Sequence, residues 1–541
     1  MILMKGVMMK RILLWVAIAT IILSLISVFS LVGCKKEKIT EEEAVEGAEE
    51  AVEGEAAPAE ETEMSLTLGL ATSQIEWWND IFVLKKTAEA TGIDIEVRPI
   101  PAGDVAAKRS TMIASKTLPD LMFNPDAEAY RTIMSMGLEG VYYPIDTILD
   151  KIPNFKRWAD KYPEFYDLMT DGDGHIYALP RINDFKLFDW GLVIRADLLE
   201  GEEITAGEIE TIEDLYKALT IIKEKKGNAP IIARSEGGGP NRFLPMAVQI
   251  FGTGLNSYYN HEMDAYSFGP MEDNFYKMVE WLNKFYEEGL INKDIFTMSD
   301  DVYSELQASD KGYFFMDNMA SIMWAGPEGA DWQVILPPEI DGKRYYGTIN
   351  KGSVDYTQLW TIPAQTENID AVAKLIDYAY SDEGIETWIW GEEGYTFTKD
   401  EEGIYTFIFN EDGWPYLTID EPIHVYDLGI FHSDWNVFVW TENIFDMTWL
   451  YTEEFKEARN MYMENGVVPD ISLPVMFTSE EDDQRIPLEQ PINTYTDEMV
   501  INFITGVKPL DEWDSFKDEL EGMGVNDLIE IYNTAFTRID K

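Results

Sequence analysis

Strand and helix patterns alternate in the first part of the chain. Residues 65–70 alternate between small or polar residues and leucine, as a β-strand does, and residues 80–90 have helical spacing. A second strand is expected at 94–98, a helix at 106–115 and a short buried strand at 120–123. This order is typical of a largely parallel sheet whose strands are joined by crossover helices. We therefore predict an α/β fold.

The middle of the chain continues in the same style. Thr211 and Asp214 form a capping pair that opens a helix ending at Gly227. Apolar residues recur at helical spacing in 270–288 and again in 368–380. The last quarter of the chain is rich in aromatic residues, Gly and Asp and has no clear periodicity, so its elements cannot be assigned from the pattern.

The N-terminus has the parts of a bacterial export signal. Basic residues precede an unbroken apolar stretch at 12–32, and the small residue Gly33 precedes Cys34. The stretch is long enough to cross a bilayer, so a retained transmembrane anchor is the alternative. Leu31-Val32-Gly33-Cys34 resembles the lipobox of bacterial lipoproteins, in which the cysteine thiol receives diacylglycerol and the chain is cut before it. This resemblance favours a signal peptide at 1–33 and a lipid anchor on Cys34.

Residues 34–63 are expected to form an acidic, disordered tether. Beyond the cysteine and a few basic residues this segment consists mainly of Glu, Ala, Gly and Val, with no aromatic residue and no apolar periodicity. Such a composition cannot bury enough surface to fold. The tether would space the remaining chain, residues 64–541, from a membrane.

Composition and charge exclude several classes of protein. Cys34 is the only cysteine, so no disulfide supports the fold and stability must come from a large apolar core. The formal charge of −57 argues against nucleic-acid binding and against adsorption to anionic lipid. Attachment to a membrane would therefore depend on the lipid.

No catalytic or metal motif is present. The four histidines lack metal-ligand spacing, and no H-E-x-x-H, GxSxG or phosphate-binding loop occurs. Asp171-Gly172-Asp173-Gly174 resembles the start of a calcium-binding EF-hand loop, but His175 and Ile176 follow where oxygen ligands are needed, so a tight turn is predicted. We expect no enzyme activity, no cofactor and no metal, although carboxylates are too numerous to exclude a glycosidase pair.

The aromatic residues are the stronger indication of function. The chain has sixteen tryptophans, and many of them stand beside Gly, Asn or Asp rather than within apolar runs. Sugars bind with their C–H faces on flat aromatic rings while polar side chains bind the hydroxyls. Core packing explains any single tryptophan equally well, but the set favours a carbohydrate-binding cleft.

Several stretches resemble family 1 extracellular solute-binding proteins. Ile176-Tyr177-Ala178-Leu179-Pro180 is similar to the "Y-x-L-P" stretch of that family, and Arg195-Ala196-Asp197-Leu198-Leu199 to its "R-x-D-x-L" strand end. The helix capped by Thr211 and the segments 288–294, 311–316 and 368–394 resemble further motifs in the same order, although Phe replaces a small residue in the 311–316 strand. The similarity is closest to large lipoproteins that serve oligosaccharide ABC importers.

This resemblance implies a two-lobed periplasmic-binding-protein-like fold (type II) with a ligand cleft between lobes joined by hinge segments. Lobe 1 is expected at about 64–185 and 330–395, and lobe 2 at about 186–329 and 396–541. The resemblance implies a lipid-anchored, monomeric binding subunit on the extracellular face of a bacterial cell membrane, which passes a carbohydrate to the ABC permease. Alternatives are a peptide or another solute as ligand, or a surface-anchored glycoside hydrolase.

Candidate ligand-binding residues come from predicted strand ends, the hinge region and exposed-looking tryptophans. They are Trp78, Asn79 and Asp80 after the first strand, Asn124 after the third, Arg181 and Trp190 near the hinge, and Arg234, Trp324, Trp360 and Trp435.

Overall fold

The computed structural model describes most of the chain after residue 63. The described residues are 64–72, 81–101, 105–124, 127–171, 174–185, 188, 190–233, 243–319, 327, 329–347, 352–409, 416–417, 423–424, 428–430, 438–447, 451–468, 475 and 477–538. Cys34, the apolar stretch before it and the acidic segment lie outside this part. Within it, no helix has the length and apolar character needed to cross a membrane.

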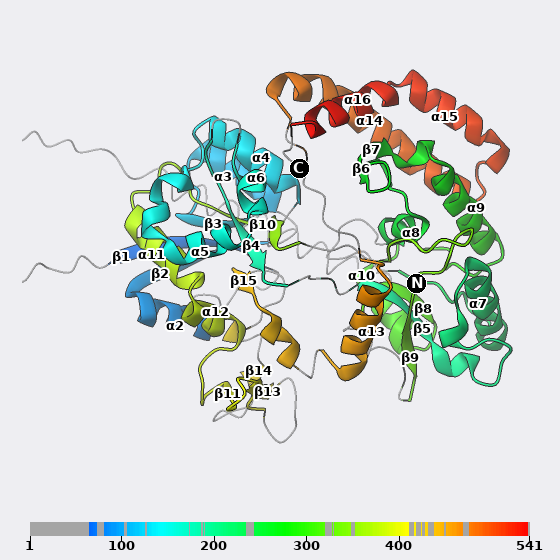
Figure 1. Cartoon of the computed structure of the whole chain (residues 1–541), viewed down its shortest axis with the longest axis horizontal. Coiled ribbons are helices and arrows are strands. Elements are labelled where there is room, and N and C mark those ends of the chain that lie inside the picture. The colour runs from blue at the N-terminus through cyan, green and yellow to red at the C-terminus, as the bar shows by residue number, and fades with distance from the viewer. Residues whose placement is uncertain are drawn as a thin grey trace, which may run out of the picture. The chain divides into compact units, whose positions relative to one another are not determined.

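A six-stranded mixed sheet forms the centre of the first lobe (Figure 1). β10 is antiparallel to both of its neighbours, β3 and β4, whereas β1 is parallel to β2 and β3, and β15 is parallel to β4. Five strands therefore run in one direction, which agrees with the predicted largely parallel sheet. The order across the sheet is β15 (Val439–Trp440), β4 (Leu179–Asn183), β10 (Val354–Thr361), β3 (Leu121–Asn124), β1 (Met64–Thr72) and β2 (Ile93–Pro101).

Helices and short hairpins complete this lobe. The helices are α2 (Phe82–Thr91), α3 (Val105–Ser115), α4 (Ala127–Leu138), η3 (Ile145–Lys151), α5 (Pro153–Lys161), α6 (Glu164–Met169), α11 (Ile369–Ala379), α12 (Asp382–Ile389), η10 (Glu442–Asp446) and α13 (Glu453–Glu464). The hairpins pair β11 (Phe397–Lys399) with β12 (Tyr405–Phe407) and β13 (Tyr416–Leu417) with β14 (Ile423–His424). The strands and helices predicted between 65 and 123, and the helix predicted at 368–380, are confirmed.

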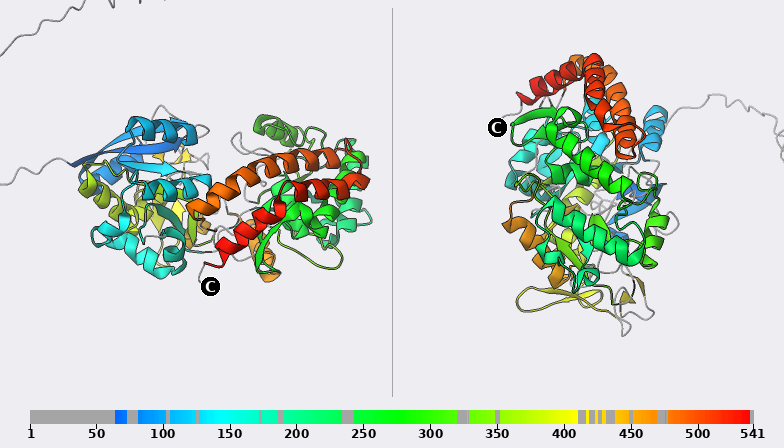
Figure 2. Two further views of the ribbon diagram at one scale, coloured as in Figure 1. Left: turned by 90° about the horizontal axis from the view of Figure 1, so that it is seen from above. Right: turned by 90° about the vertical axis from the view of Figure 1, so that its right-hand side faces the viewer.

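The second lobe combines a three-stranded antiparallel sheet with many helices. Its sheet has the order β8 (Phe314–Asn318), β5 (Trp190–Arg195) and β9 (Trp332–Ile335), and β6 (Ser257–Asn260) pairs with β7 (Ala265–Phe268). Its helices are η4 (Ala196–Leu199), η5 (Ala206–Glu208), α7 (Ile212–Lys226), α8 (Phe243–Phe251), η7 (Gly269–Met271), α9 (Asp273–Glu287), α10 (Asp300–Ala308), α14 (Ser479–Ile504), η11 (Leu510–Glu512), α15 (Trp513–Gly522) and α16 (Val525–Phe536). Figure 2 shows α14 running alongside α16.

The predicted capping pair of α7 is present. The Thr211 side chain accepts a hydrogen bond from the Asp214 backbone N–H, and the Asp214 carboxylate accepts from the Thr211 backbone N–H. The helix ends at Gly227, whose φ of 74° is readily adopted only by glycine. Local sequence alone therefore determines both ends of this helix.

Two large hydrophobic cores divide the chain at places other than the expected boundaries. The buried apolar residues described between 397 and 467, expected in lobe 2, belong to the first core, because β15 joins the six-stranded sheet and Trp390 packs against Phe397, Tyr405 and Phe407. Ile335 and Ile340, expected in lobe 1, lie in the second core, and β9 pairs with β5, whereas Val334 and Leu336 pack against the first core. Among the described residues, both cores are built from Leu66 onward, so a protein without its N-terminal apolar segment keeps these core residues.

The buried Tyr462 of α13 connects elements of the two cores. Its hydroxyl accepts a hydrogen bond from the Leu192 backbone N–H of β5 at 3.0 Å and donates to the Ile335 carbonyl of β9 at 2.9 Å. Burial raises the pKa of Tyr462, so the hydroxyl remains protonated and can donate. Leu192 and Ile335 are register partners, so Tyr462 joins both strands at the point where they pair.

We expect Tyr462→Phe to lower the free energy of unfolding by about 1–3 kcal/mol, because the buried Leu192 N–H loses its partner. Urea denaturation of the two proteins measures this difference. Tyr216→Phe is the matched control, since the Tyr216 hydroxyl bonds the exposed Glu288 at the surface of α7. Equal stability of Tyr462→Phe and the wild type would contradict the described contact.

Candidate functional site

The carboxyl edge of the six-stranded sheet is the candidate ligand site. β1, β2, β3, β4 and β15 share one direction, so their carboxyl ends lie at this edge together with the first residues of the antiparallel β10. β1 lies between β2 and β3, so the connection from β1 to β2 goes toward one side of the sheet and the connection from β2 to β3 goes back across β1 to the other side. Open α/β sheets bind ligands outside the carboxyl ends of their strands at such a reversal of strand order.

Asn124 ends β3 at this edge and has no exposed surface. Its Oδ1 accepts a hydrogen bond from Arg109 Nη1 at 3.1 Å, and its Nδ2 donates to Thr361 Oγ1 at 3.1 Å and to the Met122 carbonyl. The amide thus links α3, β3 and β10. In this conformation Asn124 holds Arg109 at the strand end rather than presenting its own surface to a ligand.

Arg181 of β4 forms a buried ion pair with Asp355 of β10. Arg181 Nη2 lies 2.5 Å from Asp355 Oδ2, and the two side chains are 7% and 2% exposed. The Arg181 guanidinium also lies 4.6 Å from the ring centroid of Trp440 on β15. Asp355 Oδ1 accepts further hydrogen bonds from the backbone N–H and the hydroxyl of Thr357. Three neighbouring strands thus fix this guanidinium at the edge.

The described tryptophan candidates have different surroundings. Trp190 begins β5, where it is half-buried and pairs in register with Asn318. Trp360 is fully buried in the first core, stacked on Phe438 at a centroid distance of 4.5 Å and packed against Phe123 at 4.9 Å. Because protein covers the Trp360 ring, it offers no face to a sugar in this conformation.

The other candidates lie outside the described residues. They are Trp78, Asn79, Asp80, Arg234, Trp324 and Trp435. In the chain, residues 73–80 directly follow β1 and residues 320–326 follow β8 closely. The structure therefore places Asn124 and Arg181 at one sheet edge. For the six candidates outside the described residues, only their positions in the sequence link them to this edge.

Three residues at this edge were absent from the predicted set: Arg109, Asp355 and Trp440. Arg109 lies in a helix of mixed character, and its 4% exposure depends on packing that sequence periodicity does not report. Asp355 stands in a strand among other polar residues. Trp440 follows Phe438 and Val439, a run that reads as ordinary core. For Asp355 and Trp440 the available signal was a position at the end of a strand, and Arg109 in α3 had no signal in the sequence.

The predicted tight turn at Asp171 is present. The Asp171 backbone N–H donates to the His175 carbonyl at 2.9 Å, and the His175 N–H donates to Asp171 Oδ1 at 2.8 Å. His175 Nδ1 also lies 3.1 Å from Asp146 Oδ2. Asp173 is outside the described residues, among which no group of three or more His, Cys, Asp or Glu could hold a metal.

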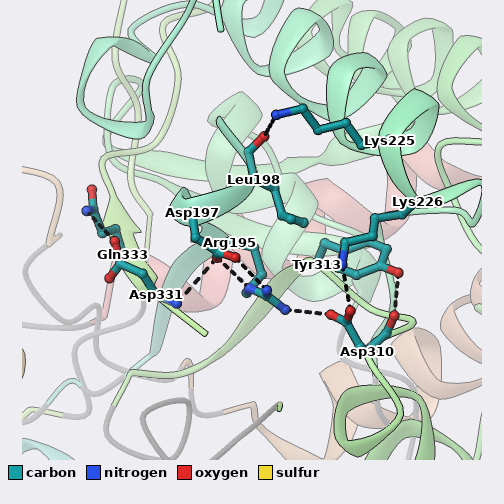
Figure 3. A network of polar contacts seen from close by, with 9 residues as sticks. All are labelled: Arg195, Asp197, Leu198, Lys225, Lys226, Asp310, Tyr313, Asp331 and Gln333. Carbon is teal, nitrogen blue, oxygen red and sulfur yellow. Dashed lines mark hydrogen bonds and ion pairs between the residues drawn. The ribbon is translucent and has the colours of Figure 1, made fainter. Parts of the chain in front are cut away.

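The Arg195-Ala196-Asp197 motif forms a polar network in the second lobe (Figure 3). The Arg195 guanidinium binds Asp197 through two contacts of 2.6 Å and Asp310 through one of 2.7 Å. Lys226 binds the other oxygen of Asp310 at 2.6 Å. Burial acts to raise the pKa of Asp310, but its hydrogen bonds to Lys226 and Arg195 outweigh burial and the pKa is lowered. This motif therefore joins α7, η4 and the turn after α10 and has a structural role.

Comparison with known proteins decides the family. A model of the bacterial extracellular solute-binding proteins matches residues 71–386, more than half of the chain. The chain belongs to this family. The two-lobed α/β architecture of such solute-binding proteins, predicted from the sequence motifs, is confirmed.

Relatives of this solute-binding protein include transporter subunits. The fructooligosaccharide ABC transporter substrate-binding protein FusA of Streptococcus pneumoniae serotype 4 is 25% identical over 481 residues, covering 84% of this chain and 86% of FusA. Among solved structures, the alginate-binding protein AlgQ2 without calcium ion has a TM-score of 0.70 at 21% identity, covering 88% of this chain and 99% of its own. An S. pneumoniae FusA EF-hand mutant in complex with fructo-nystose has a TM-score of 0.69 at 21% identity, with the same coverage.

Proposed function

We propose that this solute-binding protein captures an oligosaccharide and delivers it to the membrane permease of an ABC importer. The main support is the carboxyl edge of the six-stranded sheet, which is the side on which an open α/β sheet binds its ligand. The relative FusA is a fructooligosaccharide ABC transporter substrate-binding protein. The tryptophan-rich sequence supports a carbohydrate, because aromatic rings stack on sugar faces.

In this proposal the protein binds its ligand without changing it. Ligand held between the two lobes would favour a closed arrangement that the permease recognises, so delivery depends on closure and not on chemistry. A surface-anchored glycoside hydrolase is the competing function, and a peptide is the competing ligand. One experiment distinguishes the hydrolase function and the peptide ligand from the proposal.

The test uses the chain without its N-terminal apolar segment. Tryptophan fluorescence and isothermal titration follow the addition of oligosaccharides, and the sugar is then analysed by chromatography. Saturable binding of a sugar that is recovered intact supports the proposal. Cleavage products would establish an enzyme instead, and binding of a peptide library without any sugar would establish the other ligand class.

Trp78→Ala and Trp190→Ala are each expected to weaken sugar binding at least tenfold, because each removes a stacking face worth about 1.5–3 kcal/mol, within the range of comparable aromatic contacts. Titration calorimetry measures the change, and circular dichroism checks the fold. Trp281→Ala is the matched control, since this half-buried ring packs on Tyr216 and Phe285 at the surface of α9. Unchanged affinity in both variants would refute this placement of the site while leaving the family intact.

We also propose that lipid on Cys34 anchors the protein to the extracellular face of the cell membrane, with residues 35–63 as a spacer. The support is the lipobox-like sequence at 31–34 after a basic and apolar N-terminus. Intact-mass spectrometry of the protein from cells is expected to show that residues 1–33 are absent and that Cys34 carries a diacylglycerol, whereas Cys34→Ala should keep residues 1–33, because the cut before the cysteine follows its lipidation. Because the chain has no other cysteine, no second thiol can replace it. A wild-type protein that keeps residues 1–33 and has an unmodified Cys34 would instead indicate a transmembrane anchor.

A further inference from the structure

Arg131 of the first lobe contacts a phenylalanine of the second lobe. It is the fifth residue of α4, and two residues separate α4 from the end of β3 at Asn124. Because a helix rises about 1.5 Å per residue, Arg131 lies about 6 Å along α4 from its start, near the carboxyl edge of the six-stranded sheet. Its guanidinium lies 5.2 Å from the ring centroid of Phe477, which precedes α14 and packs against the second core. The contact therefore bridges the two lobes beside the candidate site.

Two side chains of the second lobe hold the Phe477 ring in place. The Arg485 guanidinium lies 4.5 Å from the ring centroid, and Tyr532 packs edge-on against the ring at a centroid distance of 4.9 Å. Glu489 accepts hydrogen bonds from both Arg485 and Tyr532, so the neighbours of the ring are themselves connected. The second lobe therefore presents this ring in a fixed position, whether or not Arg131 lies against it.

The Arg131 guanidinium forms no ion pair with any residue that the structure describes. The tyrosines near it come from both lobes: Tyr356 from β10 of the first lobe, and Tyr266 and Tyr532 from the second. Burial raises the pKa of these three tyrosines, and the positive charge of Arg131 opposes the rise at each of them. Cation–π attraction to Phe477 is therefore the described contact that engages the Arg131 charge, and it requires the lobes to lie this close together.

We propose that Arg131 and Phe477 form a latch that holds the two lobes in the arrangement described here, even when no solute is bound. Opening the lobes separates α4 from the segment before α14 and breaks this contact, whereas the contacts of Phe477 with Arg485 and Tyr532 stay within the second lobe. A contact that exists in only one arrangement shifts the equilibrium toward that arrangement. For a half-buried cation–π contact the shift in the population ratio is about threefold to tenfold. The latch acts in the unliganded protein, so it does not depend on the identity of the solute.

The test measures the distance between the lobes in residues 64–541, which contain all the described core residues, without any sugar. This part of the chain has no cysteine, so Lys108→Cys on α3 and Glu213→Cys on α7 place one spin label at an exposed position of each lobe. Double electron–electron resonance gives the distance distribution. We expect Arg131→Ala and Phe477→Leu each to raise the ratio of open to latched protein about threefold to tenfold. The double variant should raise the ratio no further, because either change alone removes the whole contact.

Arg157→Ala is the matched control. The Arg157 guanidinium also lies 5.2 Å from a ring centroid, that of Trp158, but both residues belong to α5, so opening of the lobes leaves this contact intact. Phe477→Trp keeps an aromatic face for Arg131 and should keep the wild-type distance distribution. An unchanged distribution in Arg131→Ala, or an equal change in Arg157→Ala, would overturn the latch.

The design keeps the latch separate from other causes. Arg131→Ala alters a half-buried side chain at the surface of α4, so it tests the latch even if Phe477→Leu disturbs the second core. Circular dichroism checks the fold of each variant. Because no sugar is present, a protein that binds no oligosaccharide can still show the expected shifts, and the latch and the proposed function therefore fail independently.

Discussion

Trp360→Ala is expected to lower the free energy of unfolding by about 3–5 kcal/mol, the cost of removing a large aromatic side chain from a packed core. The Trp360 ring has no exposed surface, stacks on Phe438 and touches Phe123. Trp360 belongs to β10, Phe123 to β3, and Phe438 immediately precedes β15. The ring therefore connects three segments that are far apart in the sequence. Urea denaturation followed by far-UV circular dichroism measures the loss.

Trp190→Ala is the control for this prediction. Its ring is half-buried at the start of β5, so the same substitution should cost much less stability. The two substitutions are therefore expected to have different effects: Trp360→Ala lowers stability, and Trp190→Ala weakens sugar binding. A loss below about 1 kcal/mol for Trp360→Ala, combined with weaker sugar binding, would reverse this assignment and return Trp360 to the ligand site.

Local sequence signals account for much of the fold. The alternation at 65–70 became β1, and the Thr211–Asp214 pair caps α7, because both depend on residues that are close in the chain. The strand expected at 94–98 ends later than predicted. β2 continues to Pro101 at the edge of the sheet, where a residue without an N–H removes no hydrogen bond from the interior.

The boundaries of the lobes could not be predicted from such signals. β15 has only two residues, too few for any periodicity, and it belongs to the first lobe because it pairs with β4, about 260 positions earlier. Similarly, Phe397, Tyr405 and Phe407 join that lobe through contact with Trp390. Both placements depend on long-range contacts, which a pattern of neighbouring residues does not encode.

The candidate site was predictable only as a set of strand ends. Asn124 and Arg181 follow from the rule that parallel strands present their carboxyl ends together. Their partners do not follow, since Asp355 lies 174 positions from Arg181 and Thr361 lies 237 from Asn124. A tryptophan next to a polar residue gave no means of distinguishing the buried Trp360 from the half-buried Trp190, because burial depends on what packs from elsewhere in the chain.

Asp355→Ala is expected to lower the free energy of unfolding by about 3–5 kcal/mol, because it leaves the buried Arg181 guanidinium without its counter-ion. Water cannot hydrate that charge, since Arg181 is only 7% exposed and Trp440 lies against it. Asp382→Ala serves as the control. Its partner Arg157 and Asp382 itself are 47% and 84% exposed, and such surface pairs contribute about 0–1 kcal/mol.

The double variant Arg181→Met with Asp355→Leu isolates the role of the pair. Replacing both charges by apolar side chains of similar size removes the need to bury an unpaired ion, so the double variant should be more stable than Asp355→Ala and closer to the wild type. Urea denaturation of the wild type, Arg181→Met, Asp355→Leu and the double variant measures the coupling free energy between the two side chains. If the double variant lost as much as the sum of the two single variants, the pair would not be coupled, and the neutralisation of Arg181 at the ligand edge would lose its support.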